Sequence, residues 1–343
     1  MKKSLLALAV LGAFAGAAQA QSAVTIYGSF DAGVRNVNNA NAAGNSKLTM
    51  SSNGQYNSNR IGFKGVEDLG GGLNAHFVLE TGFNTGTGAL DNAAKLFNRS
   101  AYVGLGGAWG SLDLGRQYSV NFKTIGMYDP FNYKFTGIIP LAGQGLLTRL
   151  DNDIQYTGTF GPVTARAEWA LGEQAGSTSN GSARAVGVGY SAGPIAAGAA
   201  YTKQTAAAAP NLETTNWTVG GAYGTGPFRV AAGYARNEAD AATGPSNDRS
   251  DAWLGGSYNV TPAAQVTLAF YRTKLDAAAA GADARRNMWV LGGTYALSKR
   301  TNFYADFDHS SFTNGSPAAW GVQPVAGNTK NVTGISVGIN HLF

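Results

Sequence analysis

The side chains that most often perform catalysis are scarce in this chain. It has no cysteine, and its histidines are His76, His309 and His341. Hydrolysis would need a base such as histidine positioned beside a nucleophile. His309 and His341 alternate in step with apolar residues, and His76 has no serine nucleophile signature beside it. We therefore expect no catalytic site.

The sequence also gives no sign of sites for metals, phosphates or nucleic acids. It contains no cysteine and histidine cluster for zinc and no glycine-rich loop with phosphate-binding spacing. Its carboxylates are scattered, so Ca²⁺ would bind only weakly at the surface. The isoelectric point of about 9.3 reflects basic residues spread singly, apart from Arg285-Arg286 and Lys299-Arg300. We expect no cofactor and no nucleic-acid partner.

The remaining candidates for chemistry are single charges that alternate with apolar neighbours. Arg60 and Lys64 share one side of a segment whose other side is apolar. Arg149 likewise shares a side with Asp151 and Asp153. Because a guanidinium stays charged at every relevant pH, arginines gathered on one polar face would form a permanent electrostatic cluster.

The elements that position these charges are predicted to be strands. Apolar and polar residues alternate in segments of about ten residues, clearest within 24–35, 73–84, 163–171, 228–234, 265–270, 302–308 and 335–343. Soluble sandwiches alternate too, but their strands average about five or six residues. Ten residues is about the length that crosses a bilayer at a tilt. Only 13% of the residues are charged, which suits strands that place one face against lipid.

Short turns recur along the second half of the chain. Pro162, Pro194, Pro227, Pro262 and Ser298 lie 32, 33, 35 and 36 residues apart, with one polar loop in each interval. Aromatic residues flank these turns: Phe160, Tyr190, Tyr223, Phe228, Tyr258 and Tyr295. Short turns at one end, long loops at the other and an aromatic girdle are typical of outer-membrane barrels. We predict an all-β fold, a transmembrane antiparallel β-barrel of about 16 strands with an aqueous channel.

One interval is longer than the others. From Gly107 to Pro162 is 55 residues, and the alternation fails between Tyr118 and Leu147. This stretch is too apolar for an exposed loop and too irregular for a strand. We expect residues 119–146, the third long loop, to fold into the lumen as a constriction loop.

Residues 1–20 have the features of a signal peptide. Lys2 and Lys3 precede an apolar run that ends at Ala17, and Ala18-Gln19-Ala20 is a small-residue cleavage site. The run is too short for a membrane anchor, and no stop-transfer pattern follows it. We expect residues 21–343 to form the exported barrel.

Six stretches occur together in this chain: VTIYG from Val24, RIGFKGVEDLG from Arg60, NRSAYVGL from Asn98, LDLGRQ from Leu112, RLDN from Arg149 and VGINHLF from Val337. In combination they resemble the general porins of Gram-negative bacteria, in the branch typical of beta-proteobacteria. The resemblance covers residues 21–343. It implies a homotrimer of sixteen-stranded barrels in the outer membrane, each narrowed by its third loop. It also implies a water-filled channel for passive diffusion of small hydrophilic solutes and ions, and no enzyme.

The resemblance also implies a constriction in which wall arginines face acidic groups on the third loop. Carried over by position, the wall residues are Arg60, Arg99, Arg149 and Glu80, and the loop carboxylate is Asp129. The chain departs from the family by placing Lys123 and Lys134 in this loop, and Lys64 is predicted to face the lumen as well. More basic than acidic candidates predicts a modest preference for anions.

Two further residues have predicted roles. Arg116 shares the side of Leu112 and Leu114, which should face lipid, so we expect it in or near the subunit interface of the trimer. Phe343 is the last outward residue. By resemblance it also belongs to the signal read by the outer-membrane assembly machinery.

Two other functions stay open at this point. An outer-membrane protease or lipase would need the catalytic group that the histidines do not provide. A sugar-specific channel or an adhesin is the other alternative, because Phe122, Phe131, Tyr133 and Phe135 could line an aromatic slide. We prefer packing of these rings against the barrel wall. The expected partners are small solutes and anions, outer-membrane lipid and lipopolysaccharide.

Overall fold

The computed structural model describes residues 23–41, 43–50, 54–135, 148–244, 246, 248–277, 283–314 and 330–343. The predicted signal peptide, residues 1–20, and residues 136–146 of the predicted constriction loop lie outside these ranges. Across the described ranges, no helix has both the length and the hydropathy needed to span a bilayer.

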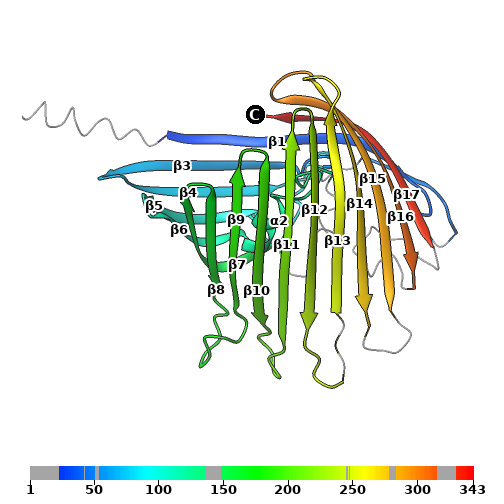
Figure 1. Cartoon of the computed structure of the whole chain (residues 1–343). Coiled ribbons are helices and arrows are strands. Elements are labelled where there is room, and N and C mark those ends of the chain that lie inside the picture. The colour runs from blue at the N-terminus through cyan, green and yellow to red at the C-terminus, as the bar shows by residue number, and fades with distance from the viewer. Residues whose placement is uncertain are drawn as a thin grey trace, which may run out of the picture.

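Sixteen long strands form a closed antiparallel barrel, which confirms the predicted fold (Figure 1). Each strand pairs with the next along the chain, and the last pairs with the first. A short additional strand, β2 (Lys47–Thr49), pairs with β1 in the first loop. The barrel strands are β1 (Ala23–Val37), β3 (Arg60–Gly70), β4 (Leu73–Gly82), β5 (Ser100–Gly107), β6 (Gly110–Tyr118), β7 (Arg149–Phe160), β8 (Val163–Ala170), β9 (Ala183–Ala192), β10 (Ile195–Thr205), β11 (Glu213–Thr225), β12 (Phe228–Ala239), β13 (Asp248–Asn259), β14 (Ala264–Asp276), β15 (Ala284–Ala296), β16 (Thr301–Thr313) and β17 (Asn331–Leu342).

The barrel closes between β1 and β17, from Ser29 opposite Leu342 to Val37 opposite Gly334. The pairing extends one step further, because Gly28 and Phe343 exchange backbone hydrogen bonds of 3.2 and 3.3 Å. Closure satisfies the backbone N–H and C=O groups of both strands, which the interior of a bilayer requires.

The turns and loops fall where the sequence predicted them. Short turns at Pro162, Pro194, Pro227, Pro262 and Ser298 connect the strand pairs β7–β8, β9–β10, β11–β12, β13–β14 and β15–β16. The polar segments between the remaining pairs form the longer loops at the other end of the barrel (Figure 1).

The two faces of the sheet differ as a transmembrane barrel requires. Outward side chains are apolar and exposed, as Ile26 (58%) and Leu254 (57%) illustrate. The aromatic residues beside the short turns also point outward and are exposed: Phe160, Tyr190, Tyr223, Phe228, Tyr258 and Tyr295. Inward side chains such as Ser29, Gln155 and Asn216 are polar and buried. The exposed apolar face is therefore the one that meets lipid.

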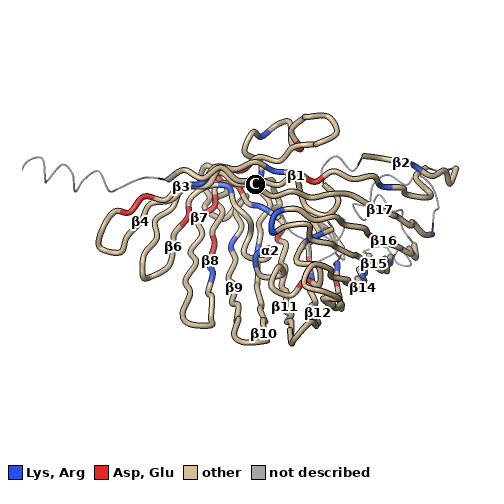
Figure 2. Tube along the Cα trace, turned by 90° about the horizontal axis from the view of Figure 1, so that it is seen from above, with Lys and Arg blue, Asp and Glu red and all other residues tan. Residues whose placement is uncertain are grey.

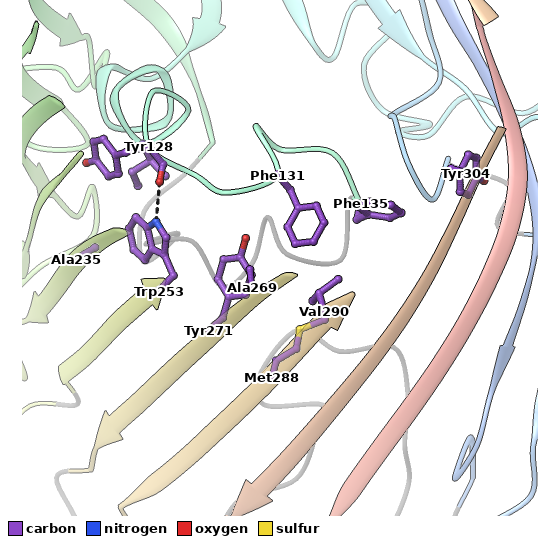
Figure 3. Close-up of a cluster of buried hydrophobic side chains, with 11 residues drawn as sticks. Tyr128, Phe131, Phe135, Ala235, Trp253, Ala269, Tyr271, Met288, Val290 and Tyr304 are labelled. Carbon is purple, nitrogen blue, oxygen red and sulfur yellow. Dashed lines mark hydrogen bonds between the residues drawn. The ribbon is translucent and has the colours of Figure 1, made fainter. Parts of the chain in front are cut away.

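The main buried cluster lies between the inner wall and the third loop, not between two sheets. The loop begins with the short helix α2 (Val120–Ile125), which the strands enclose (Figure 2). Ile125, Tyr128, Phe131 and Phe135 of the loop pack against inward residues of β12 to β16, with Trp253 among them (Figure 3). The described half of the predicted constriction loop is thus folded inward, as expected.

Candidate functional site

The third loop begins with a capped turn of helix pressed against the wall. Ser119 is the N-cap of α2, and its side chain accepts a hydrogen bond from the backbone N–H of Phe122. This satisfies one of the helix's unpaired donors. Val120, Thr124 and Ile125 on the wall side of the helix are fully buried. The helix therefore lies on the inner faces of β8 to β11.

Glycines make room for the loop on these strands. Gly189, Gly198, Gly220 and Gly233 lie directly opposite one another on β9, β10, β11 and β12, and we call them the glycine row. A Cβ at Gly189 would come within 2.6 Å of the Met127 sulfur, and one at Gly220 would overlap the Tyr128 ring. The loop can approach the backbone this closely only because these side chains are absent.

Polar contacts hold the loop after the helix. The guanidinium of Arg229 on β12 donates to the backbone oxygens of Met127 (3.1 Å), Asp129 (3.0 Å) and Pro130 (3.3 Å). The indole N–H of Trp253 donates to the backbone oxygen of Tyr128 at 3.1 Å (Figure 3). The Tyr128 hydroxyl in turn bonds to Thr218 at 2.8 Å. These bonds join the loop to three neighbouring strands.

Asp129 does not take the position predicted for it. Its carboxylate accepts the Tyr271 hydroxyl at 2.8 Å and the backbone N–H groups of Phe131 and Tyr133 at 3.0 and 2.9 Å. The side chain is fully buried, and burial raises the pKa of its carboxyl to about 6. Asp129 therefore closes a turn of the loop on the wall side and does not face the wall arginines, which corrects the expected arrangement.

The wall cluster forms around Glu80. The Arg99 guanidinium donates to Glu80 at 2.7 Å, the Tyr27 hydroxyl donates at 2.9 Å, and Arg60 lies 3.8 Å from the same carboxylate. Arg99 and Glu80 are both buried. Because a buried carboxylate with these partners is held in one geometry, Glu80 fixes the position of two arginines.

Tyr118 connects the third arginine to this cluster. Its hydroxyl oxygen accepts from Arg99 at 2.6 Å and from Arg149 at 2.8 Å. The Arg149 guanidinium also lies 4.4 Å from the centre of the Tyr118 ring. The predicted wall residues Arg60, Arg99, Arg149 and Glu80 are thus brought together, with a formal charge of 3 − 1 = +2.

A stack of rings links the wall cluster to the loop. Phe122 of α2 stacks on Tyr118 with 4.8 Å between ring centres, and Tyr133 stacks on Phe122 at 4.2 Å. Phe131 and Phe135 are instead buried against the wall. The four loop aromatics therefore divide into a packed pair and a stacked pair, and they do not form one continuous slide.

A bulge in β7 changes the side on which some charges lie. Asn152 has a positive φ of 53°, and the pairing with β6 shifts by one residue here. Asp153 remains inward and buried, whereas Asp151 is exposed. The prediction that both share one side is therefore wrong, because an extra residue in a strand reverses its alternation.

Asp151 pairs with the residue assigned to a subunit interface. Arg116 lies 2.6 Å from Asp151 and donates to the backbone oxygen of Asn98 at 2.6 Å. Lys95 also pairs with Asp151. The charge of Arg116 on the outer side is thus satisfied within its own chain.

The three predicted lysines lie in different surroundings. Lys64 is exposed on the lumen side of β3, with its ammonium 5.3 Å from the Tyr27 ring centre. Lys123 turns toward the wall and donates to Gln155 and Gln117, and burial lowers its pKa. Lys134 lies over the Tyr56 ring, and burial, with the nearby Arg60 adding, lowers its pKa to about 8.

Sequence reasoning missed Arg229, Tyr118, Tyr27 and the glycine row. Alternation reads Tyr27, Arg229 and the glycine row as inward, but nothing local tells that Arg229 meets a loop about 100 residues away. Tyr118 has the parity of the outward Leu112 and Leu114, so alternation does not place it in the lumen. Of the histidines, His76 faces the lumen with its ring 2.7 Å from Asp113, and His309 bonds to Thr333. In the described part of the chain, no group of three or more metal-binding side chains comes together.

Comparisons with known proteins agree with this geometry. The family profile described as Gram-negative porin matches residues 7–315. An outer membrane porin protein of Bordetella pertussis is 33% identical, over 89% of this chain and 93% of its own length. Outer membrane porin protein 32 of Delftia acidovorans is 35% identical, over the full length of both chains.

Solved structures give the same fold. The anion-selective porin from Comamonas acidovorans superimposes with a TM-score of 0.78 and 26% identity, covering 94% of this chain and 100% of that one. OmpT of Vibrio cholerae, in a structure described as its trimer form, gives a TM-score of 0.71 at 16% identity, covering 94% and 99%.

Proposed function

The chain belongs to the Gram-negative porin family, and from this premise we propose that its channel passes anions in preference to cations. It is a porin of the outer membrane, a water-filled barrel through which small hydrophilic solutes and ions diffuse passively, and not an enzyme. What we add is the sign of the selectivity and the residues that set it.

The observation that carries the proposal is the unequal charge of the wall cluster. Arg60 and Arg99 contact the one carboxylate, Glu80, and Arg149 joins them through Tyr118. Lys134 of the loop lies close enough to Arg60 for the two charges to repel. The loop carboxylate that would balance them, Asp129, is turned away and buried. Lys64 adds a further positive charge on the lumen side.

Charge of one sign near a narrow passage acts strongly on ions. Low-dielectric walls on all sides reduce screening, so a fixed charge within a Debye length of about 10 Å at 0.1 M salt is felt by each passing ion. A cluster of net positive charge raises the local anion concentration and lowers that of cations. The expected preference is modest, because Glu80 offsets one arginine.

The first test is single-channel recording across a planar lipid bilayer with a KCl gradient. A reversal potential favouring chloride, with conductance steps in groups of three, would support an anion-preferring trimer. Equal permeability of chloride and potassium would refute the charge argument. Absence of any conductance from well-folded protein would contradict the channel itself.

Assembly as a homotrimer is part of the proposal, supported by the trimer form of OmpT, which shares this fold. Arg116 stays a candidate for the subunit contact, although its ion pair with Asp151 is internal to one chain. Unchanged trimer stability in detergent for Arg116→Ala would remove that role.

Export and insertion complete the proposal. We assign residues 1–20 to a signal peptide and Phe343 to the signal for the assembly machinery. The Phe343 ring packs 5.5 Å from that of Phe30 at the barrel closure, so its loss could also weaken the barrel. Refolding of a Phe343 deletion variant in detergent separates the two: an assembly signal is needed in cells only. Outer-membrane lipid and lipopolysaccharide are the expected surroundings.

A further inference from the structure

A second loop contributes to the constriction. Residues 54–59 connect β2 to β3, and we call them the inner segment. Its two asparagines are buried, Asn57 (5% exposed) and Asn59 (0%). The strand that follows begins at Arg60, opposite Ser29, although β1 continues to Val37. The inner segment therefore lies against the inner face of the barrel near the closure of β1 with β17, far around the barrel from the strands that carry α2.

The carboxylate of Asp31 holds the inner segment in place. It accepts the backbone N–H groups of Gln55 at 3.1 Å, Tyr56 at 3.2 Å and Asn57 at 2.9 Å. It also accepts the Tyr304 hydroxyl at 2.8 Å, and the side chain is fully buried. Successive backbone N–H groups that converge on one anion fix the conformation of a short segment. The charge of Asp31 is thus matched by four donors beneath the segment.

Tyr56 connects the inner segment to the third loop. Its backbone oxygen accepts the N–H of Phe135 at 2.8 Å. Its ring stacks on that of Tyr304 and meets that of Phe135 edge-on, with 5.4 Å between ring centres in both pairs. Phe135 and Tyr304 belong to the buried cluster beneath the loop (Figure 3). Because the Lys134 ammonium lies 5.4 Å from the centre of the Tyr56 ring, this contact also sets the position of a loop charge.

Asn57 connects the inner segment to the wall cluster. Its side-chain oxygen accepts from Arg60 at 3.4 Å, and the backbone oxygen of Ser58 accepts from the same guanidinium at 3.5 Å. The Asn57 amide donates to Ser29 at 2.9 Å. Arg60 is therefore held on one side by the inner segment and on the other by Glu80, 3.8 Å away.

We propose that Asp31 is a positioning residue for ion selectivity, which holds the inner segment so that Arg60 and Lys134 keep their charges at the constriction. The proposal rests on the proposed anion preference and adds a residue that acts through others. It assigns an acidic side chain a supporting role in anion selectivity. Charge alone would give the opposite sign, because removal of a carboxylate from the lumen should strengthen an anion preference.

Three variants separate these two accounts. Asp31→Asn keeps the size of the side chain but replaces one accepting oxygen by an amide that donates, so at least one backbone N–H of the inner segment loses its acceptor. Tyr56→Leu removes the ring contacts without a change of charge. Asp251→Asn is the matched control, because Asp251 is also an inward, buried carboxylate and its hydrogen bonds are with Arg249 and Thr273 on the wall.

The permeability ratio of chloride to potassium is measured from the reversal potential of the full-length protein in a KCl gradient. We expect the ratio to fall at least about twofold in Asp31→Asn and in Tyr56→Leu, as displacement of one positive charge from the passage implies. It should be unchanged or higher in Asp251→Asn. An unchanged or raised ratio in Asp31→Asn would overturn the proposal, and so would an unchanged ratio in Tyr56→Leu.

Trypsin cleavage of the folded protein gives a readout that does not depend on conduction. Release of the inner segment should free the end of the third loop, so cleavage after Lys134 should be at least about tenfold faster in Asp31→Asn and Tyr56→Leu. Cleavage after Lys123 should be unchanged, because α2 packs on other strands. A parent channel without anion preference would refute the selectivity proposal and still leave this test of positioning.

If Asp31→Asn fails to fold, Tyr56→Leu carries both measurements, because it leaves the side chains of the barrel strands unchanged. Cleavage after Lys134 at the parent rate in folded Tyr56→Leu would show that the inner segment does not hold the third loop.

Discussion

Replacing Arg229 by alanine tests how the third loop is held in the lumen. One guanidinium donates to three backbone oxygens, those of Met127, Asp129 and Pro130. Without it these acceptors lose their partner, while the bonds from Trp253 and Tyr271 remain. We expect the barrel to fold and the loop to leave the wall more often.

The size of the effect follows from the three bonds. A hydrogen bond to a charged group contributes about 1.5–3 kcal/mol, and an unsatisfied buried acceptor costs about 1–3 kcal/mol. Water in the lumen can reach part of the vacated site, so we expect a total of about 2–4 kcal/mol. Since 1.4 kcal/mol is about tenfold, the population of the displaced loop should rise by roughly 30-fold or more. Arg229→Lys should lie between, because an ammonium cannot span the three oxygens.

Trypsin cleavage of the folded protein at Lys123 and Lys134, both in the loop, measures this population, and single-channel current noise gives a second readout. Arg166→Ala is the matched control, since Arg166 is an inward arginine on β8 that makes no hydrogen bond or ion pair with the described residues of the loop. Cleavage of Arg229→Ala no faster than that of Arg166→Ala, with equal current noise, would refute the reasoning.

Three further predictions concern charge and space in the lumen. Glu80→Gln removes the carboxylate between the wall arginines. A unit charge about 8 Å from an ion in water contributes about 0.5 kcal/mol before screening, so the chloride-to-potassium permeability ratio should rise about two- to threefold. An unchanged reversal potential would show that passing ions do not sense the charge of the wall cluster. Burial lowers the pKa of Lys134 to about 8, so its positive charge is present at pH 7 and lost as the pH rises through 8. The anion preference should therefore fall between pH 7 and pH 9, and Lys134→Met should abolish this fall. The same fall in the variant would show that another group causes it. Gly220→Val should push Tyr128 and the loop into the lumen and lower the conductance. Gly221→Val, on the outward face, should leave the conductance unchanged. Equal conductances of the two variants would contradict the close packing of Tyr128 on Gly220.

Much of the fold could be predicted because a barrel strand shows its two faces in the sequence. Alternation located the strands, and Pro162, Pro194 and Pro227 marked short turns that the structure confirms. The third loop was found from the failure of the same alternation. Arg60, Arg99, Arg149 and Glu80 came from resemblance, and their convergence depends on a residue, Tyr118, that no pattern distinguished.

What could not be predicted depends on contacts distant in the chain or on a single local irregularity. Asn152 adds one residue to β7, which reverses the alternation and moves Asp151 to the outside. Asp129 is the loop carboxylate, but three hydrogen bonds from Tyr271 and two backbone N–H groups fix it on the wall side. Alternation carries no information on such pairings.

The glycine row gives this channel an unusual mutational sensitivity. Where the loop lies on bare backbone, no wall side chain separates it from the strands, so the loop takes up less of the lumen. A side chain at Gly189 or Gly220 would meet Met127 or Tyr128 of the loop, and one at Gly233 would meet Trp253 and Tyr128. Cells under pressure to reduce uptake thus have positions in the wall, Gly189 and Gly220 first, at which a single substitution presses on the loop from behind.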